Sequence, residues 1–197
     1  MAKTATDRDV LEAGRPMRAD ARRNRERLVE AAREVFEEQG AGASMEAIAK
    51  KAGVGVGTLY RHFPNRIDVV EAVYETDVQV LADAAQRAVA ELDPWPALEA
   101  FFDAFLRYAR TKQVLLGELQ VAFEKNPDLR SRARALIDSS FDLVIENAKQ
   151  AGEVRGDVSG SDLTQLVSPI CVSSSVPPEQ ARRLLGMILD GLRPPRR

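Results

Sequence analysis

The sequence has very few of the side chains that most often build disulfides, metal sites and nucleophilic centres. Its 197 residues include one cysteine, Cys171, and one histidine, His62. A single cysteine excludes an internal disulfide framework, and these two residues leave too few of the usual ligands for zinc. The chain also shows no nucleophile–base–orienter set, no spaced carboxylate pair and no phosphate-binding loop. We therefore expect neither an enzyme nor a metal or other cofactor.

Long hydrophobic runs are also missing. No run approaches the roughly 18 apolar residues of a membrane-spanning helix, and no charged-then-apolar leader opens the chain. Hydrophobic residues nevertheless make up 45% of the chain, which is ample for a core. We expect a soluble, cytoplasmic protein with no membrane partner. Cys171 is then most simply a small buried hydrophobe, with a thiol sensor as the alternative.

A large net charge of one sign is absent, but the charges are unevenly distributed. The net charge is −2, while residues 1–66 hold 13 of the 28 Lys and Arg and 10 of the 30 Asp and Glu. Seven arginines and three acids lie between Arg15 and Arg33. We interpret the arginine-rich segment 15–27, which includes Arg22, as an arm that contacts DNA; a solvated helix face is the alternative.

Helical periodicity runs through almost the whole chain, and no credible strand pattern is present. Apolar residues recur at intervals of three and four, as they do on the buried face of a helix. The pattern predicts an all-α protein of about nine helices. We place a disordered basic arm at residues 1–19, a three-helix unit at 20–66 and a second helical domain at 67–197.

The three-helix unit ends in the stretch GVGVGTLYRHF, residues 53–63. Alternating glycines suggest a nucleotide loop, but that fingerprint, G-x-G-x-x-G, needs glycine at Thr58 and a strand before the loop. The preceding apolar stripe instead predicts a short helix with Ser44 as its N-cap. A second short helix follows the glycines and ends at Pro64. Two short helices joined by a glycine turn predict a helix-turn-helix unit.

The second helix of such a unit enters the major groove of DNA with its N-terminal residues nearest the bases. Here these residues are Val56, Gly57 and Thr58. Val56 can touch a thymine methyl group, Gly57 lets the backbone approach closely, and Thr58 can hydrogen-bond a base or a phosphate.

Groups suited to phosphate binding follow directly. Tyr60, Arg61 and His62 continue the helix, and Arg66 stands at the start of the next one, where the positive helix end adds to its charge. Tyr60 could equally pack in the core, and His62 could equally have a structural role.

This combination of residues resembles the signature of the TetR family of transcriptional repressors. The matching segments are SMEAIAKKAGV at 44–54, GTLYRHF at 57–63 and Asn65-Arg66. The resemblance implies a homodimer whose N-terminal unit binds operator DNA and whose C-terminal domain dimerises and binds a small-molecule inducer. By position, it assigns DNA contacts to Ser44, Val56, Gly57, Thr58, Tyr60, His62 and Arg66.

Two residues depart from the family pattern. Gly55 stands where a serine commonly caps the second helix, at an expected cost of a few tenths of a kcal/mol. Ala47 stands where an acidic residue is common, so Ser44 loses its capping-box partner. Gly55 also puts a direct phosphate contact at its own position in doubt.

The second domain carries signals for helix ends. Ser159 and Asp162 predict a capping box, and Pro169 predicts a kink or an end in the helix that follows. By resemblance, the last two helices pair with their copies in a dimer, through Leu163, Leu166, Leu184, Leu185 and Ile188.

The aromatic residues of the second domain could line an inducer pocket or simply fill a core. The candidates are Phe101, Phe105, Tyr108, Phe123 and Phe141. Polar groups could come from Glu118, Gln120, Asp138 or Asn147. This composition favours a mostly apolar or aromatic inducer, not a sugar phosphate or a metal.

Two other functions compete with a ligand-responsive repressor. A nonspecific DNA-organising protein would be basic throughout, whereas residues 67–197 are net acidic. An activator of the same fold would share every feature above.

Overall fold

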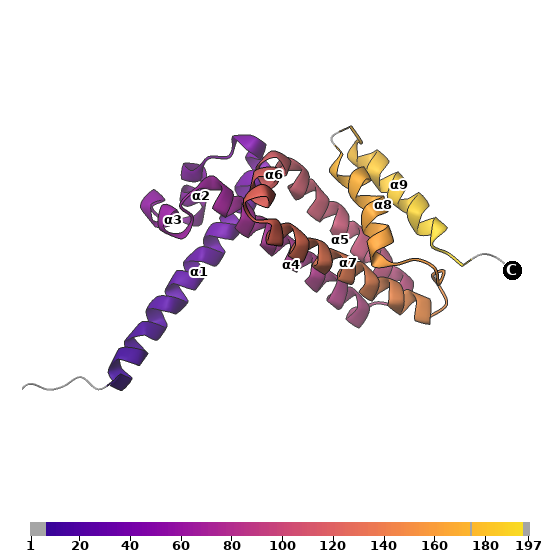
Figure 1. The fold of residues 1–197 in the computed structure, drawn as a ribbon, viewed down its shortest axis with the longest axis horizontal. Coiled ribbons are helices and arrows are strands. Elements are labelled where there is room, and N and C mark those ends of the chain that lie inside the picture. Colours follow the sequence, from indigo (N-terminus) through magenta and orange to yellow (C-terminus); the bar gives the residue numbers. More distant parts are fainter. Residues whose placement is uncertain (1–6, 174, 195–197) are drawn as a thin grey trace, which may run out of the picture. The chain divides into compact units, whose positions relative to one another are not determined.

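The structure is a computed structural model that describes residues 7–173 and 175–194, with side chains from Asp20 onward except at residue 41. In this part of the chain every regular element is helical, as the sequence predicts (Figure 1). The chain forms two compact units, Met1–Val69 and Val70–Arg197. None of the described helices combines the length and the apolar character that a membrane crossing requires.

The first unit is a helix-turn-helix with a long leading helix. Its elements are α1 (Asp7–Gln39), the 3₁₀ turn η1 (Gly40–Gly42), α2 (Met45–Ala52), α3 (Val56–His62) and the first turn of α4 (Arg66–Glu91). Helix α1 begins at Asp7, so residues 7–19, which were expected to form a disordered arm, are helical in the structure. A helix already nucleated by packing extends by one hydrogen bond per residue and needs no apolar periodicity to do so. The arm's residues 1–6 lie outside the described residues.

Helices α1 and α2 pack through apolar side chains and are joined at their surface by Lys51. The buried residues include Leu28, Ala32, Val35, Phe36, Ile48 and Ala49. Lys51 Nζ lies 2.7 Å from Glu34 Oε2 and 3.0 Å from Glu38 Oε1, and these carboxylates raise the pKa of Lys51. Ser44 caps α2 as predicted, since its hydroxyl oxygen accepts a hydrogen bond from Ala47 N at 3.1 Å.

The turn between α2 and α3 depends on Gly53. Its φ of +67° is in the left-handed region that glycine adopts without steric cost. Arg27 on α1 donates from Nη2 to the Ala52 carbonyl oxygen at 2.6 Å, just before this turn. The carbonyl end of α2 is therefore held by α1, and the direction of α3 is set by the glycine that follows.

The second unit consists of the rest of α4 and five more helices in the described residues. These are α5 (Pro94–Val114), α6 (Leu116–Lys125), α7 (Pro127–Gln150), α8 (Gly160–Val172) and α9 (Pro178–Gly191). Its core is aromatic where α5 packs on α7. The centre of the Phe141 ring lies 4.8 Å from the ring centre of Phe101, 5.1 Å from that of Phe105 and 5.6 Å from that of Phe102.

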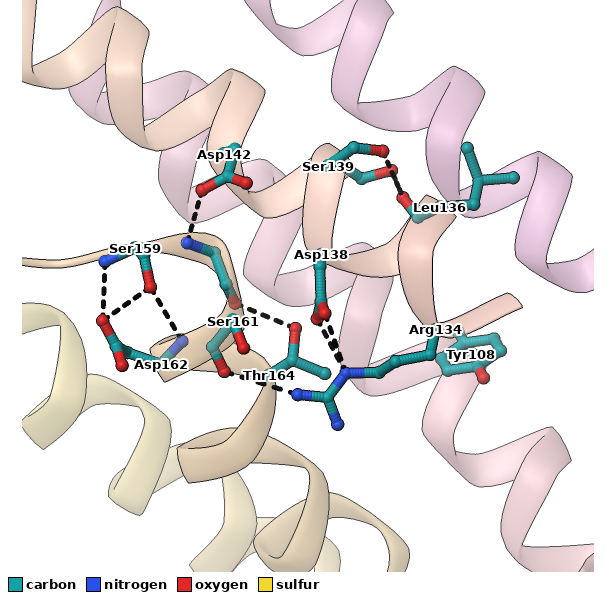
Figure 2. Close-up of polar contacts among 12 residues, drawn as sticks. Tyr108, Arg134, Leu136, Asp138, Ser139, Asp142, Ser159, Ser161, Asp162 and Thr164 are labelled. Carbon is teal, nitrogen blue, oxygen red and sulfur yellow. Dashed lines mark hydrogen bonds and ion pairs between the residues drawn. The ribbon is translucent and has the colours of Figure 1, made fainter. Parts of the chain in front are cut away.

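Helices α7 and α8 approach so closely that only glycine fits at the start of α8. A Cβ atom on Gly160 would lie 2.2 Å from the Asp138 carbonyl oxygen and 2.8 Å from Asp142 N. The Gly160 amide donates to Asp142 Oδ1 at 2.5 Å across the same junction (Figure 2). The predicted capping box is present beside it, where Ser159 and Asp162 bond each other's backbone amides.

The sequence predicted a kink or an end of the helix at Pro169, and α8 does not end there. It continues to Val172. Pro169 lies near the C-terminal end of the helix. Proline cannot donate a backbone hydrogen bond, but only three helical residues follow it, so little packing depends on the missing bond.

The Gly160 contact generates a prediction for stability. Gly160→Ala should lower the free energy of unfolding by roughly 1–3 kcal/mol, because the methyl group meets main-chain atoms that can move only with their helix. Urea denaturation of the full chain measures the change. Gly117→Ala is the matched control, since Gly117 lies in the first turn of α6 with open space around its Cβ position. Equal stabilities of the two variants would contradict the close approach.

Candidate functional site: nucleic-acid interface and ligand cavity

One face of α3 is exposed, and the other anchors it in the first unit. Leu59 is fully buried, and Phe63, which directly follows the helix, is buried with it. Val56 and Tyr60 are 37% and 43% exposed, and Gly57 and Arg61 are exposed beside them. The four exposed residues are spaced one and four apart, so they lie on one side of the helix.

The predicted DNA-contacting residues therefore divide by environment. Tyr60 points outward and does not fill the core, whereas Thr58 and His62 are half-buried. The His62 ring lies 6.4 Å from that of Phe63. Arg22 is exposed on α1, with Nε 3.6 Å from Glu26 Oε1, and Ser44 is exposed with its oxygen engaged in the cap. An exposed ion pair at that distance is weak, so Arg22 can exchange it for a phosphate.

Arg66 is half-buried and turns its side chain toward the interior of the first unit. Its Nη1 donates to the Ala43 carbonyl oxygen, and its guanidinium carbon lies 5.0 Å from the centre of the Phe36 ring. Helix α4 is capped independently, since Asn65 and Asp68 exchange side-chain-to-backbone hydrogen bonds of 3.1 Å. Arg66 thus joins α4 to α1, a role that the sequence alone did not reveal.

The residues assigned to a dimer interface are not equally accessible. Leu163 and Leu185 are only 1% and 4% exposed in the single chain, so they have almost no area left for a second copy. Leu184 and Ile188 are half-buried, and Leu166 is 52% exposed. Met187, which was not among the predicted interface residues, is 66% exposed on α9.

A cavity of about 500 Å³ lies within the second unit. Its wall comes from α4, α5, α6, α7 and α8. The lining residues are Tyr74, Phe105, Tyr108, Lys112, Leu116, Gln120, Phe123, Arg130, Arg134, Ile137, Thr164, Ser168, Pro169 and Val172. This volume is in the range of cavities that bind small organic molecules.

The structure separates the predicted pocket residues into two groups. Phe105, Tyr108, Phe123 and Gln120 line the cavity. Phe101 and Phe141 do not line it, because their rings pack against each other in the aromatic core between α5 and α7. Glu118, Asp138 and Asn147 are also absent from the wall.

Two tyrosines meet at the cavity wall. The hydroxyl groups of Tyr74 and Tyr108 are 3.3 Å apart, and Tyr74 also contacts Phe123 edge-on with ring centres 5.4 Å apart. Burial raises the pKa of Tyr108 well above its usual value, and the neighbouring Tyr74 and Asp77 add to that shift. Burial also raises the pKa of Tyr74, so both hydroxyl groups are neutral near pH 7. Tyr108 donates its proton to Tyr74, which leaves the Tyr74 O–H as the donor available to a ligand.

Arg134 connects the cavity to the junction of α7 and α8. Its Nε donates to both carboxylate oxygens of Asp138 at 2.9 Å, and its Nη2 reaches the Ser161 carbonyl oxygen at 3.5 Å. Figure 2 shows the guanidinium between Asp138 on α7 and Ser161 on α8. Thr164 Oγ1 donates to the Gly160 carbonyl oxygen at 2.9 Å one turn further along α8.

Three cationic lining residues were not predicted, although the sequence held a signal for them. Lys112 follows Phe105 and Tyr108 at helical spacings of seven and four, so it shares their face of α5. Arg130 and Arg134 precede Ile137 at spacings of seven and three on α7. A cation on the face that otherwise carries buried residues indicates either a snorkelling side chain or a binding site.

The described residues contain no group of three or more His, Cys, Asp or Glu side chains arranged to hold a metal. Cys171 is buried on α8, and burial raises the pKa of its thiol to about 11.

Comparison with known families matches both parts of the chain. Residues 28–73 match the model described as bacterial regulatory proteins, tetR family. Residues 93–194 match the C-terminal domain described as transcriptional regulator SbtR-like. An HTH-type transcriptional regulator of Staphylococcus aureus is 45% identical over 129 residues, covering 64% of this chain and 68% of the relative.

Solved structures give the same result. A TetR transcriptional regulator from Streptomyces coelicolor is 39% identical, with a TM-score of 0.76 over 87% of this chain and 99% of that one. A TetR regulatory protein from Mycobacterium vanbaalenii is 34% identical, with a TM-score of 0.71 over 91% of this chain and 100% of that one. These relatives are transcriptional regulators and not enzymes.

The inward position of Arg66 generates a second prediction. Arg66→Ala should lower the free energy of unfolding by roughly 1–3 kcal/mol, because it removes a charged hydrogen bond and a cation–π contact. Arg61→Ala, at an exposed position two residues beyond Leu59, should change it by less than about 0.5 kcal/mol. Chemical denaturation of both variants checks this. A fully stable Arg66→Ala protein would mean that the inward contacts contribute nothing.

The environment of Cys171 generates a third prediction, which concerns the reactivity of its thiol. With a pKa of about 11, only about one thiol in a thousand is ionised at pH 8. Iodoacetamide should therefore alkylate the native protein far more slowly than the urea-unfolded protein, as followed by mass spectrometry. Rapid native alkylation would favour the thiol-sensor alternative.

Proposed function

Because the chain belongs to the TetR family of bacterial regulatory proteins, we propose that it is a repressor that binds a palindromic operator as a homodimer. A small molecule bound in the cavity of the second unit releases it from the operator. A regulator of chromosomal genes with these properties works in the cytoplasm.

The exposed face of α3 is the observation that supports DNA recognition most directly. Val56 and Gly57 start this helix, where a recognition helix meets base edges, and Tyr60 and Arg61 follow one turn later. Arg61 is exposed and forms no ion pair with a described carboxylate, so binding a phosphate breaks no existing contact. Arg22 and Ser44 extend the phosphate-binding surface onto α1 and α2.

A homodimer supplies the two-fold symmetry that a palindrome requires. We assign its interface to the accessible side chains of α8 and α9, namely Leu166, Leu184, Met187 and Ile188. Leu166 and Met187 leave more than half of their surface exposed in the single chain, which favours their burial in an assembly.

The cavity suits an inducer with an apolar body. Phe105, Leu116, Phe123 and Ile137 supply apolar wall, and Tyr74 brings α4 into contact with the ligand. The same helix starts in the first unit, where Arg66 joins it to α1. A ligand that favours one position of α4 would change the spacing of the two reading helices in a dimer and so lower operator affinity.

DNA binding is tested with a duplex that the protein itself selects from a random pool. Arg61→Ala should weaken binding to all duplexes about equally and flatten the slope of log affinity against log salt by about one unit. Thr58→Ala should instead change which sequence is selected. Fluorescence anisotropy at several salt concentrations, and repeated selection with the variant, measure the two effects.

Arg87→Ala is the control, because Arg87 is an exposed arginine of the second unit. It should leave both the affinity and the salt slope unchanged. If the wild-type protein binds selected and random duplexes equally well at fixed salt, the protein is a nonspecific DNA-organising protein and the repressor proposal fails.

A further inference from the structure

We propose that the cavity takes an organic anion with an apolar body, and that Lys112, Arg130 and Arg134 bind its acidic group. This inference rests on the proposed function only in treating the cavity as the regulatory site. It narrows the mostly apolar inducer expected from the sequence to an amphipathic acid.

The charges on the cavity wall are all of one sign. Three of the lining side chains are cationic, and no aspartate or glutamate is among them. The three cations come from two helices, Lys112 from α5 and Arg130 and Arg134 from α7. They lie close enough for Arg130 and Arg134 to lower the pKa of Lys112, together with the larger effect of burial.

Lys112 is the member of this cluster that most needs a counter-ion. It is half-buried, and no described carboxylate lies within ion-pair distance of its ammonium group. The ammonium group contacts the rings of Tyr74 and Tyr108, whose centres each lie 5.9 Å from Nζ. Ring contacts at this distance offset only part of the cost of removing a lysine from water.

Arg134 and Arg130 are held differently. Arg134 is fixed through Nε by Asp138, so its position is set before a ligand arrives. Arg130 is exposed, with the Phe123 ring 6.0 Å from its guanidinium carbon, and it is free to move onto a bound group. The neutral Tyr74 hydroxyl, which accepts from Tyr108, can donate a further hydrogen bond to the acid. The buried carboxylate of Asp77 acts on Tyr108 but is not part of the wall.

Ligands of other charge fit this wall less well. A cation would meet three like charges, of which that of Arg134 is already paired with Asp138, and no acid on the cavity wall itself. A neutral apolar molecule would cover the ammonium group of Lys112 and deepen its desolvation without compensation. The apolar lining extends beyond the cations through Phe105, Leu116, Ile137, Pro169 and Val172, so a small inorganic anion would leave most of the cavity unfilled.

The test uses the full chain and a series of ω-phenylalkanoates of increasing chain length, each paired with its neutral primary amide. Isothermal calorimetry and thermal shift measure binding without DNA. The acids should bind at least about tenfold more tightly than their amides. A charge-assisted hydrogen bond contributes more binding free energy than a neutral one, and the difference corresponds to a roughly tenfold or greater ratio of affinities. Sodium phosphate alone should shift the melting temperature far less than the best acid.

Two variants identify the group that binds the acid. Lys112→Met keeps the length of the side chain and removes its charge, and it should weaken acid binding roughly 10- to 100-fold while leaving amide binding about unchanged. It should also raise the melting temperature of the ligand-free protein. Arg110→Gln, at an exposed α5 position outside the cavity wall, should alter neither property.

The outcomes separate this inference from the proposed function. Equal binding of acids and amides, no binding of any acid, or unchanged acid binding by Lys112→Met overturns the anion site. If acids bind as expected but do not release the selected duplex, the anion site stands and ligand-controlled repression fails. If amides release the duplex as well as acids do, repression stands and the anion site fails.

Discussion

The close approach of α7 and α8 is the constraint on which the second unit depends. Without a side chain at Gly160, the start of α8 can lie against the main chain of Asp138 and the backbone of Asp142. That approach brings Thr164 and Ser168 of α8 to the same cavity as Arg134 and Ile137 of α7. A larger residue at this point would separate the two helices and open the cavity wall between them. A residue with no side chain therefore determines the shape of the cavity.

The sequence predicted local features well, because they depend on residues close together in the chain. The all-α class, the Ser44 cap, the Ser159–Asp162 capping box and the glycine turn at Gly53 follow from helix periodicity and from cap and turn chemistry. The first-unit residues expected to contact DNA could be named because they lie within one short motif, and their DNA contacts stay predictions. Their exposure, and the outward position of Tyr60, required the structure.

The cavity was only partly predictable, because its wall is built from five helices that are distant in sequence. Composition identified aromatic residues but could not decide which of them fill the core, and Phe101 and Phe141 do so. Lys112, Arg130 and Arg134 looked like ordinary surface charges in a chain with 28 basic residues. Arg66 also has a role that its position beside the motif did not reveal, since it packs against Phe36 and bonds the Ala43 carbonyl oxygen; its DNA contact stays a prediction.

The buried state of Cys171 makes this chain a convenient background for measuring distances in solution. A thiol with a pKa of about 11 in a chain with no other cysteine leaves almost no competing site for labels. A cysteine introduced at exposed Tyr60 would therefore carry a spin label at a single defined place on the reading helix. In a symmetric dimer, two such labels would report the distance between the reading helices by pulsed electron resonance. Comparing the distance distributions with and without a ligand would then show whether binding in the cavity changes the separation of the reading helices.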